Sequence, residues 1–94
     1  MTDADVWERI GNLLEFPVAF PIKVMGRRTD DFAQSIAALV SAHVPDFNPA
    51  SVELRASSRG AWLSVTITVR AQSREQLQTL YRELSSHPLV RIVL

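Results

Sequence analysis

Apolar and polar side chains alternate without interruption between residues 62 and 70 of this chain. The apolar positions are Leu63, Val65, Ile67 and Val69, and the positions between them are Trp62, Ser64, Thr66, Thr68 and Arg70. Side chains of a β-strand point alternately to opposite faces, so this period of two places one set in a core and the other outside it. The segment therefore predicts a long strand, and the fold must supply a cover for its apolar face.

The residues after this strand predict a covering helix and a last strand. Ser73 and Gln76 have the S-x-x-Q spacing of a helix capping box. An apolar stripe of helical period follows them, formed by Leu77, Leu80, Tyr81 and Leu84. Pro88 ends the helix. Residues 89–94 are apolar except for one arginine, and we expect them to join the same sheet as its last strand.

The first half of the chain predicts two helices around a strand. A short amphipathic helix over 6–14 is expected, with Asp5 and Glu8 at its cap. Pro21 has no N–H and suits the first residue of a strand over 22–25, which Gly26 ends by letting the chain turn. The second helix covers 32–40, and its expected capping residues are Thr29, Asp30 and Asp31.

A second strand completes the set of elements. Val52, Leu54 and Ala56 alternate with polar residues, which predicts a half-buried strand over 52–56. A turn at 58–60 connects it to the long strand. After the N-terminal helix, the order is β-α-β-β-α-β. This is the order of the ferredoxin-like split βαβ fold, an α+β sandwich with two helices on one face of a four-stranded antiparallel sheet. We expect one domain over 16–94, preceded by a helical extension over 1–15.

Composition narrows the classes of function. Ten basic residues balance ten acidic ones, so the chain as a whole lacks the positive field that attracts nucleic acid or an anionic membrane. No apolar run approaches the ~20 residues of a membrane span. The acidic N-terminus is unlike an export signal, and cysteine is absent, as in many proteins of a reducing cytosol. We therefore expect a cytoplasmic protein with no nucleic-acid or membrane partner and no cofactor.

The face of the sheet opposite the helices is the broadest candidate site. Its predicted members are Lys23 and Met25 of the first strand, Glu53 and Arg55 of the second, Trp62, Ser64, Thr66, Thr68 and Arg70 of the third, and Arg91 of the last, with Leu89 and Val93 beside Arg91. This mixture of apolar and charged side chains is typical of a surface that binds a partner. The alternative is a solvated face with cross-strand charge pairs.

Several separated motifs resemble the YbeD-like family of small bacterial proteins. The segment Phe16–Gly26 is similar to the family signature F/Y-P-x-x-F-x-x-K-V-M-G. The similarity continues through Ser57–Gly60, Ser64–Thr68, Leu80-Tyr81 and Val90–Leu94, so it spans roughly residues 13–94. The resemblance implies a fold like that of ACT-type regulatory domains. It implies no catalytic residues, because the family has none established. Ala61 departs from the small polar residue that is frequent in the family.

The loop before the second helix is the candidate for a small ligand. Its residues are Gly26, Arg27, Arg28 and Thr29. Backbone N–H groups at a helix start, with two arginines beside them, suit a small carboxylate or phosphate. The resemblance to ACT domains implies that such a loop takes small effectors. The alternative is an ordinary turn and cap, because Asp30 and Asp31 already supply negative charge there.

Lys23 is the remaining candidate ligand contact. A charge in the middle of a strand is expected to pair with Glu53, to lie against Trp62, or to present a cation to a ligand.

Catalytic, metal-binding and RNA-binding readings have weaker support. Arg59-Gly60 match the start of an RNP1 motif, but Ala61, Leu63 and Thr66 occupy its aromatic positions. His43 and His87 lack neighbours at metal-ligand spacing, so no metal site is predicted. No nucleophile–base pattern is visible. We therefore expect a non-catalytic regulatory or protein-interaction module, which senses a small metabolite or binds a partner protein. The alternatives are an enzyme of unrecognised type and an RNA-binding domain.

The margins of the predicted sheet suggest self-association. In this fold the second and fourth strands lie at the edges. The fourth strand carries one charge, Arg91, and such an edge pairs readily with another chain. We expect a homodimer, or cover of this edge by the N-terminal helix.

Overall fold

Two ten-residue strands, β1 (Val18–Arg27) and β3 (Trp62–Ala71), pair antiparallel along their whole length at the centre of the sheet. The computed structural model describes residues 3–94. β2 (Glu53–Ala56) lies outside β3, and β4 (Val90–Val93) lies outside β1. The order β2-β3-β1-β4 is that of the ferredoxin-like fold, so the predicted edge positions of the second and fourth strands are confirmed.

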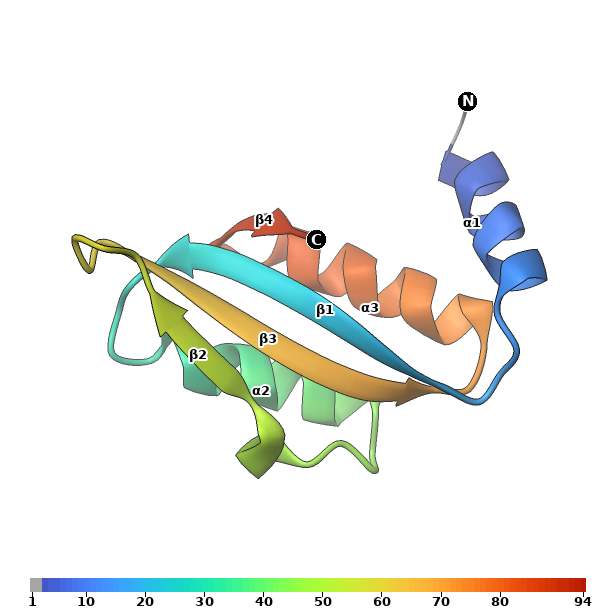
Figure 1. Ribbon diagram of the computed structural model, residues 1–94, viewed down its shortest axis with the longest axis horizontal. Helices are drawn as coiled ribbons and strands as arrows, with labels where there is room; N and C mark the ends of the chain where they lie inside the picture. Colours follow the sequence, from blue (N-terminus) through green and yellow to red (C-terminus); the bar gives the residue numbers. More distant parts are fainter. Residues whose placement is uncertain (1–2) are drawn as a thin grey trace.

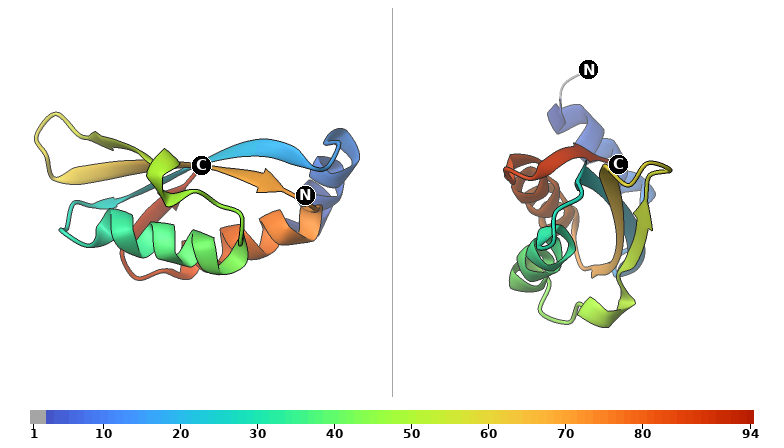
Figure 2. Two further views of the ribbon diagram at one scale, coloured as in Figure 1. Left: turned by 90° about the horizontal axis from the view of Figure 1, so that it is seen from below. Right: turned by 90° about the vertical axis from the view of Figure 1, so that its left-hand side faces the viewer.

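Helices α2 (Phe32–His43) and α3 (Arg74–Ser86) lie together on one side of this sheet (Figure 1, Figure 2). The other side is open. Helix α1 (Asp3–Leu13) lies at one end of the molecule, beside the start of α3. A short 3-10 turn, η1 (Pro49–Ser51), precedes β2. No helix within residues 3–94 is long and apolar enough to cross a bilayer.

The alternation along β3 has the predicted orientation. Val65 and Ile67 have no exposed surface, whereas Thr66 is half-buried and Thr68 is exposed. The buried positions of β1 and β3 pack on the apolar stripes of both helices. The completely buried members of this core include Ile22, Val24, Phe32, Ile36, Val40, Leu77, Leu80 and Leu84. Removing water from these side chains is the main favourable contribution to folding.

Pro21 lies inside β1 and not at its start, so β1 is longer than predicted. Lys23 and Leu94 exchange backbone hydrogen bonds of 3.1 and 2.8 Å, which shows that the N–H and C=O of Lys23 point toward β4. Backbone groups two residues apart in a strand point the same way, so the nitrogen of Pro21 also points to that side. β4 does not extend so far along β1. The missing N–H therefore costs no ladder hydrogen bond.

Gly26 was predicted to end the strand in a turn, and this prediction is wrong. Gly26 is buried within β1 and has no positive φ. Its role is to permit close packing. A Cβ at this position would clash with the backbone carbonyl of Leu89 and lie 2.8 Å from the ring of Phe32. The positive φ of 74° belongs to Gly60, in the predicted turn between β2 and β3.

The predicted faces of the last strand are partly wrong, because β4 contains a bulge. Met25 lies opposite Ile92, and Gly26 lies opposite Val90, so Arg91 is the extra residue. Arg91 and Ile92 are both exposed, while Val90 and Val93 are partly buried against the core. Strict alternation had placed Leu89 and Val93 on the open face, but both pack against the core. Ile92 takes the place beside Met25 on the open face.

β2 is not half-buried as predicted, because all four of its residues are exposed. Leu54 lies opposite the buried Val65 and shares its face, yet 56% of its surface is exposed. The reason is the position of the helices, which lie beneath the other strands and leave β2 uncovered on the outside of the sheet (Figure 2). The alternation predicted the face of Leu54 correctly, but no helix in the described part of the chain packs against β2 on that face.

The predicted cap forms at the start of α3, whereas the predicted N-cap Asp31 of α2 makes no side-chain cap bond. Ser73 accepts a hydrogen bond from the N–H of Gln76 at 3.1 Å, as predicted, while the Gln76 side chain accepts from the N–H of Gln72 at 2.7 Å. The backbone N–H of Glu75 lowers the pKa of its own carboxyl, and the Arg74 guanidinium lowers it further. At α2, Asp31 is at the N-cap position but makes no side-chain cap bond.

Trp7 is the aromatic side chain through which helix α1 packs on α3. Trp7 packs edge-on against Tyr81 of α3, with ring centroids 5.5 Å apart, and Tyr81 in turn contacts Phe20 of β1. Burial raises the pKa of the Tyr81 hydroxyl. Asp5 lies inside α1, so the predicted cap at Asp5 is wrong. Figure 1 shows α1 away from β4, so it does not cover that edge.

We predict that Gly26→Ala destabilises the fold by about 1–3 kcal/mol, the usual cost of overpacking. The backbone of Leu89 and the buried ring of Phe32 leave no room for a methyl group. Urea unfolding measures the loss. Gly11→Ala is the matched control. The three atoms nearest to a Cβ there all belong to the flexible side chain of Arg74, and alanine favours a helix over glycine by up to about 1 kcal/mol. Equal effects of the two variants would contradict the close-packing role of Gly26.

We predict that the chain loses stability at alkaline pH through Tyr81. The pKa of Tyr81 is raised in the folded state above its ordinary value of 10.0, so the folded state favours the neutral hydroxyl. This contribution is complete below the ordinary value and is lost as the pH rises through the raised one. Tyr81→Phe keeps the ring and should flatten the curve of unfolding free energy as the pH rises above about 10. Parallel curves for both proteins would refute this assignment.

Candidate functional site

Strand register brings most of the predicted open-face residues together. One row across the sheet contains Arg55, Ser64, Met25 and Ile92. The next row contains Glu53, Thr66, Lys23 and Leu94. Neighbouring strands are about 4.8 Å apart, and successive rows on one face are about 7 Å apart. The candidate residues Met25, Arg55, Trp62 and Thr66 therefore form one surface, which we call the open face.

A shallow apolar hollow of about 180 Å³ lies on the open face between β1, β3 and β2. Its lining includes Met25, Trp62 and Arg55, as predicted, together with Ala56, Ser57 and Ser64. Trp62 is 41% exposed, which is high for a large aromatic side chain. Sequence reasoning missed Ala56 and Ser57, because only the register of the β2–β3 hairpin brings them beside Trp62. The backbone N–H of Ser57 donates a hydrogen bond to the carbonyl of Trp62 at 2.9 Å.

A second hollow of about 310 Å³ adjoins the first and shares Arg55 and Ser64 with it. Lys23, Thr66 and Glu53 form its other side. Thr66 separates Lys23 from Glu53 by two strand spacings, roughly 10 Å. Within the described chain Lys23 forms no ion pair, so its predicted pairing with Glu53 is wrong. Its ammonium group projects from the open face and is available to a partner.

Arg27, and not Lys23, lies against Trp62. The guanidinium carbon of Arg27 is 5.1 Å from the centre of the indole ring. Such a contact is worth about 0.5–1 kcal/mol at an exposed site. It holds Trp62 at the end of the apolar hollow and covers part of the ring. The sequence contains both residues, but their contact could not be predicted from it, because it depends on the strand register that places Arg27 opposite Trp62.

The loop predicted to hold a small ligand is not gathered into a site. Gly26 faces the core, whereas Lys23 faces the open side. The N–H of Arg28 bonds to the carbonyl of Ala61 at 3.0 Å, and the Thr29 hydroxyl donates to Asp31 at 2.9 Å. Neither of the two hollows on the open face is lined by any residue from 26 to 29. Their hydrogen bonds are those of a turn that leads into α2.

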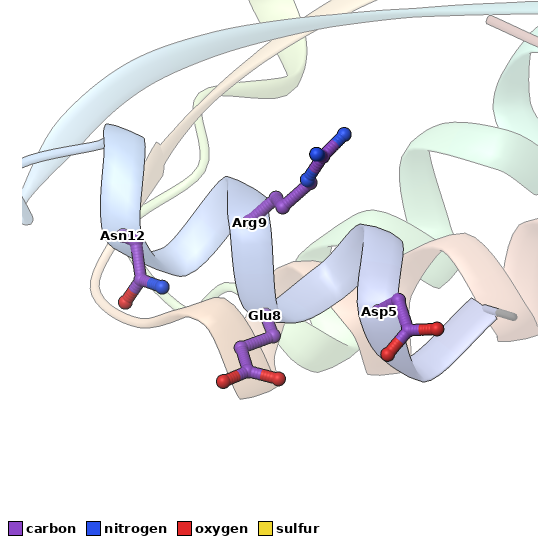
Figure 3. Close-up of a pocket in the computed structure, with 4 residues that line it drawn as sticks. All are labelled: Asp5, Glu8, Arg9 and Asn12. Carbon is purple, nitrogen blue, oxygen red and sulfur yellow. The ribbon is translucent and has the colours of Figure 1, made fainter. Parts of the chain in front are cut away.

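A hollow on the surface of α1 offers little convergent chemistry. Figure 3 shows the residues that line it, Asp5, Glu8, Arg9 and Asn12, and all four belong to α1. Arg9 points to a different side of the helix from Glu8. Side chains from one exposed helical surface do not enclose a ligand.

Residues 3–94 contain no candidate metal site, because no three His, Cys, Asp or Glu side chains among them come close enough to hold an ion. His87 lies at the end of α3, and its Nδ1 accepts a hydrogen bond from the N–H of Leu89 at 3.1 Å. His43 is in the last turn of α2. Both positions are those of ordinary helix ends.

Comparisons with solved structures show the fold. The solution structure of the ACT domain from GTP pyrophosphokinase of Chlorobium tepidum superimposes with a TM-score of 0.65, at 18% identity, over 82% of this chain and 83% of that one. The crystal structure of the same domain gives 0.56 at 16% identity, over 82% and 97%. At these low sequence identities, the similarity shows a shared fold and gives no information about function.

Comparisons of sequence show the family. Residues 11–94 match the family described as "Protein of unknown function (DUF493)". A UPF0250 protein of Ralstonia nicotianae is 52% identical over 88% of this chain and 86% of the relative. A UPF0250 protein of Janthinobacterium sp. (strain Marseille) is 54% identical over 88% and 91%. The YbeD-like resemblance and the ACT-like fold are thereby confirmed, and the chain belongs to the DUF493 family.

Proposed function

We propose that this protein is a non-catalytic interaction module of the cytoplasm, which binds a partner protein on its open face. The observation that carries the proposal is the uncovered side of the sheet. It holds an apolar hollow, an exposed Trp62 and several charged side chains that have no ion-pair partner within the described chain. Exposed apolar groups surrounded by polar ones are typical of protein-binding surfaces.

Regulation through such contacts is part of the proposal. The structural neighbours are ACT domains taken from a GTP pyrophosphokinase, where the fold is one part of an enzyme. By analogy, this chain would act on a separate enzyme by docking to it. A metabolite-sensing role at residues 26–29 receives less support, because the backbone N–H of Arg28 already bonds to Ala61 in the β2–β3 turn and the Thr29 hydroxyl donates to Asp31. A catalytic role receives less support, because Glu53 and Lys23 flank Thr66 on the open face but, within the described chain, neither makes a hydrogen bond to the hydroxyl of Thr66 or Ser64.

A photo-cross-linking amino acid tests which face is used. Placed at Thr66, at the centre of the open face, it should give a protein adduct in the native cell. Placed at Gln34, an exposed position of α2, it should not. Adducts are compared after irradiation by electrophoresis and mass spectrometry. Adducts from position 34 alone would show that the helical side is the binding surface and would refute the proposal.

We also propose that the chain forms a homodimer through β4. β4 is an edge strand whose outward backbone groups have no strand partner within the described chain, and the apolar Ile92 is exposed on it. Because the strand is short, bulged and carries Arg91, the pairing would comprise a few hydrogen bonds. Because Leu94 bonds to Lys23, the backbone N–H of Val93 points outward along this edge.

Val93→Pro should therefore remove an outward donor, leave the pairing with β1 intact, and convert a dimer to a monomer. Sedimentation measures the mass over a range of concentrations. Val93→Ala is the control for the shortened side chain, and it should remain dimeric. A wild-type protein that is monomeric at all concentrations would end the proposal of a dimer.

A further inference from the structure

We infer that the partner segment recognised by the open face is acidic and carries an apolar anchor residue. This inference rests on the proposed function and names the chemistry of the partner. It follows from three properties of the open face: its charge, the size of the apolar hollow, and the distance from that hollow to the nearest cations.

The charge of the open face is strongly positive although the chain is neutral. The basic residues that the strands place on it or at its β4 edge are Lys23, Arg27, Arg55, Arg70 and Arg91. Glu53 is the acidic side chain that strand register places there within residues 3–94. Most other acidic residues lie on α1, at the start of α2, in the loop before β2, or on α3. A face with this excess selects and steers partners of negative charge.

The apolar hollow suits one side chain and not a metabolite. Small-molecule sites usually measure about 300–1,000 Å³ and enclose most of the ligand. This hollow holds about 180 Å³, and both it and the adjoining hollow of about 310 Å³ are open to solvent, so neither encloses a ligand. Trp62 and Met25 give it an apolar wall and floor. A single leucine or phenylalanine side chain, inserted there, would remove apolar surface from water and serve as an anchor.

The second hollow lies at the distance of the next outward residue in an extended chain. It adjoins the first along the strands, about 7 Å away, which is the two-residue repeat of a strand. A carboxylate placed there would lie between Lys23 and Arg55. The partner motif is therefore an apolar residue with an acidic residue two positions away. Glu53 lies beside this second position and weakens the attraction.

A single-stranded nucleic acid fits this face less well than an acidic polypeptide. Proteins that bind single strands on a sheet use several aromatic side chains to stack successive bases. Among the described residues of the open face, Trp62 is the aromatic one, and Arg27 already occupies part of its ring. A polypeptide needs one apolar anchor and a few charges, which this face provides.

A fluorescein-labelled polyglutamate peptide with one central phenylalanine is the probe. Its anisotropy should rise on adding the wild-type chain at about 50 mM NaCl, and affinity should fall at about 300 mM as salt screens the charges. Replacing the phenylalanine by alanine should weaken binding several-fold. Backbone NMR shifts should map to β1, β2 and β3 on the open face. A polylysine peptide of the same design should not bind, and an oligouridine should bind more weakly than the acidic peptide.

Variants then locate the contact. Arg55→Glu and Lys23→Glu should each weaken binding at least about tenfold, which corresponds to about 1.4 kcal/mol. Glu53→Gln should strengthen binding, because it removes the one carboxylate beside the second hollow. Arg82→Glu is the matched control. It makes the same change of net charge on exposed α3 and should alter affinity by less than about twofold.

The outcomes separate this inference from the proposed function. An equal loss from Arg82→Glu, or tighter binding of oligouridine than of the acidic peptide, would overturn the acidic-segment inference. If the peptide does not bind while the cross-link at Thr66 persists, the partner chemistry is wrong and the proposed function stands. If both signals are absent, both proposals fail.

Discussion

The antiparallel register between β1 and β3 is the constraint on which the rest of the structure depends. It places Ile22 opposite Ile67 on the core side and, one step along, Lys23 opposite Thr66 on the open side. A slip of one residue would move every apolar side chain of one strand to the wrong face. The core and the candidate binding surface are therefore two consequences of one pairing. Burial of the core maintains the geometry of the surface.

The position of the edge strand β4 depends on the close contact at Gly26 of β1. The backbone of Leu89 and the ring of Phe32 both come against Gly26, and no larger residue leaves them room. At the same place β4 bulges, which turns Val90 and Val93 inward. The bulge therefore shortens the regular part of this edge that could pair with another chain. A residue on the buried face thus shapes both the margin of the open face and the surface available for self-association.

Local patterns predicted the architecture because they depend on few neighbours. The alternation around Thr66 and the Ser73 cap each express a preference that the surrounding fold did not override. The failures need tertiary information. The exposure of Leu54 depends on where the helices stop, and the place of Pro21 depends on the length of β4. In the site, the sequence identified Trp62, but its contact with Arg27 required the register.

Net charge was the least informative property, for a reason rooted in secondary structure. Acidic residues are favoured at helix starts by the helix dipole, as with Asp31 and Glu75. Strand positions that face the helices must be apolar, so charges on the strands can lie only on the other face. Here those charges are mainly basic, as with Arg55 and Arg70. A chain that sums to zero thereby presents a positive sheet, and a partner responds to the charge of the face that it touches.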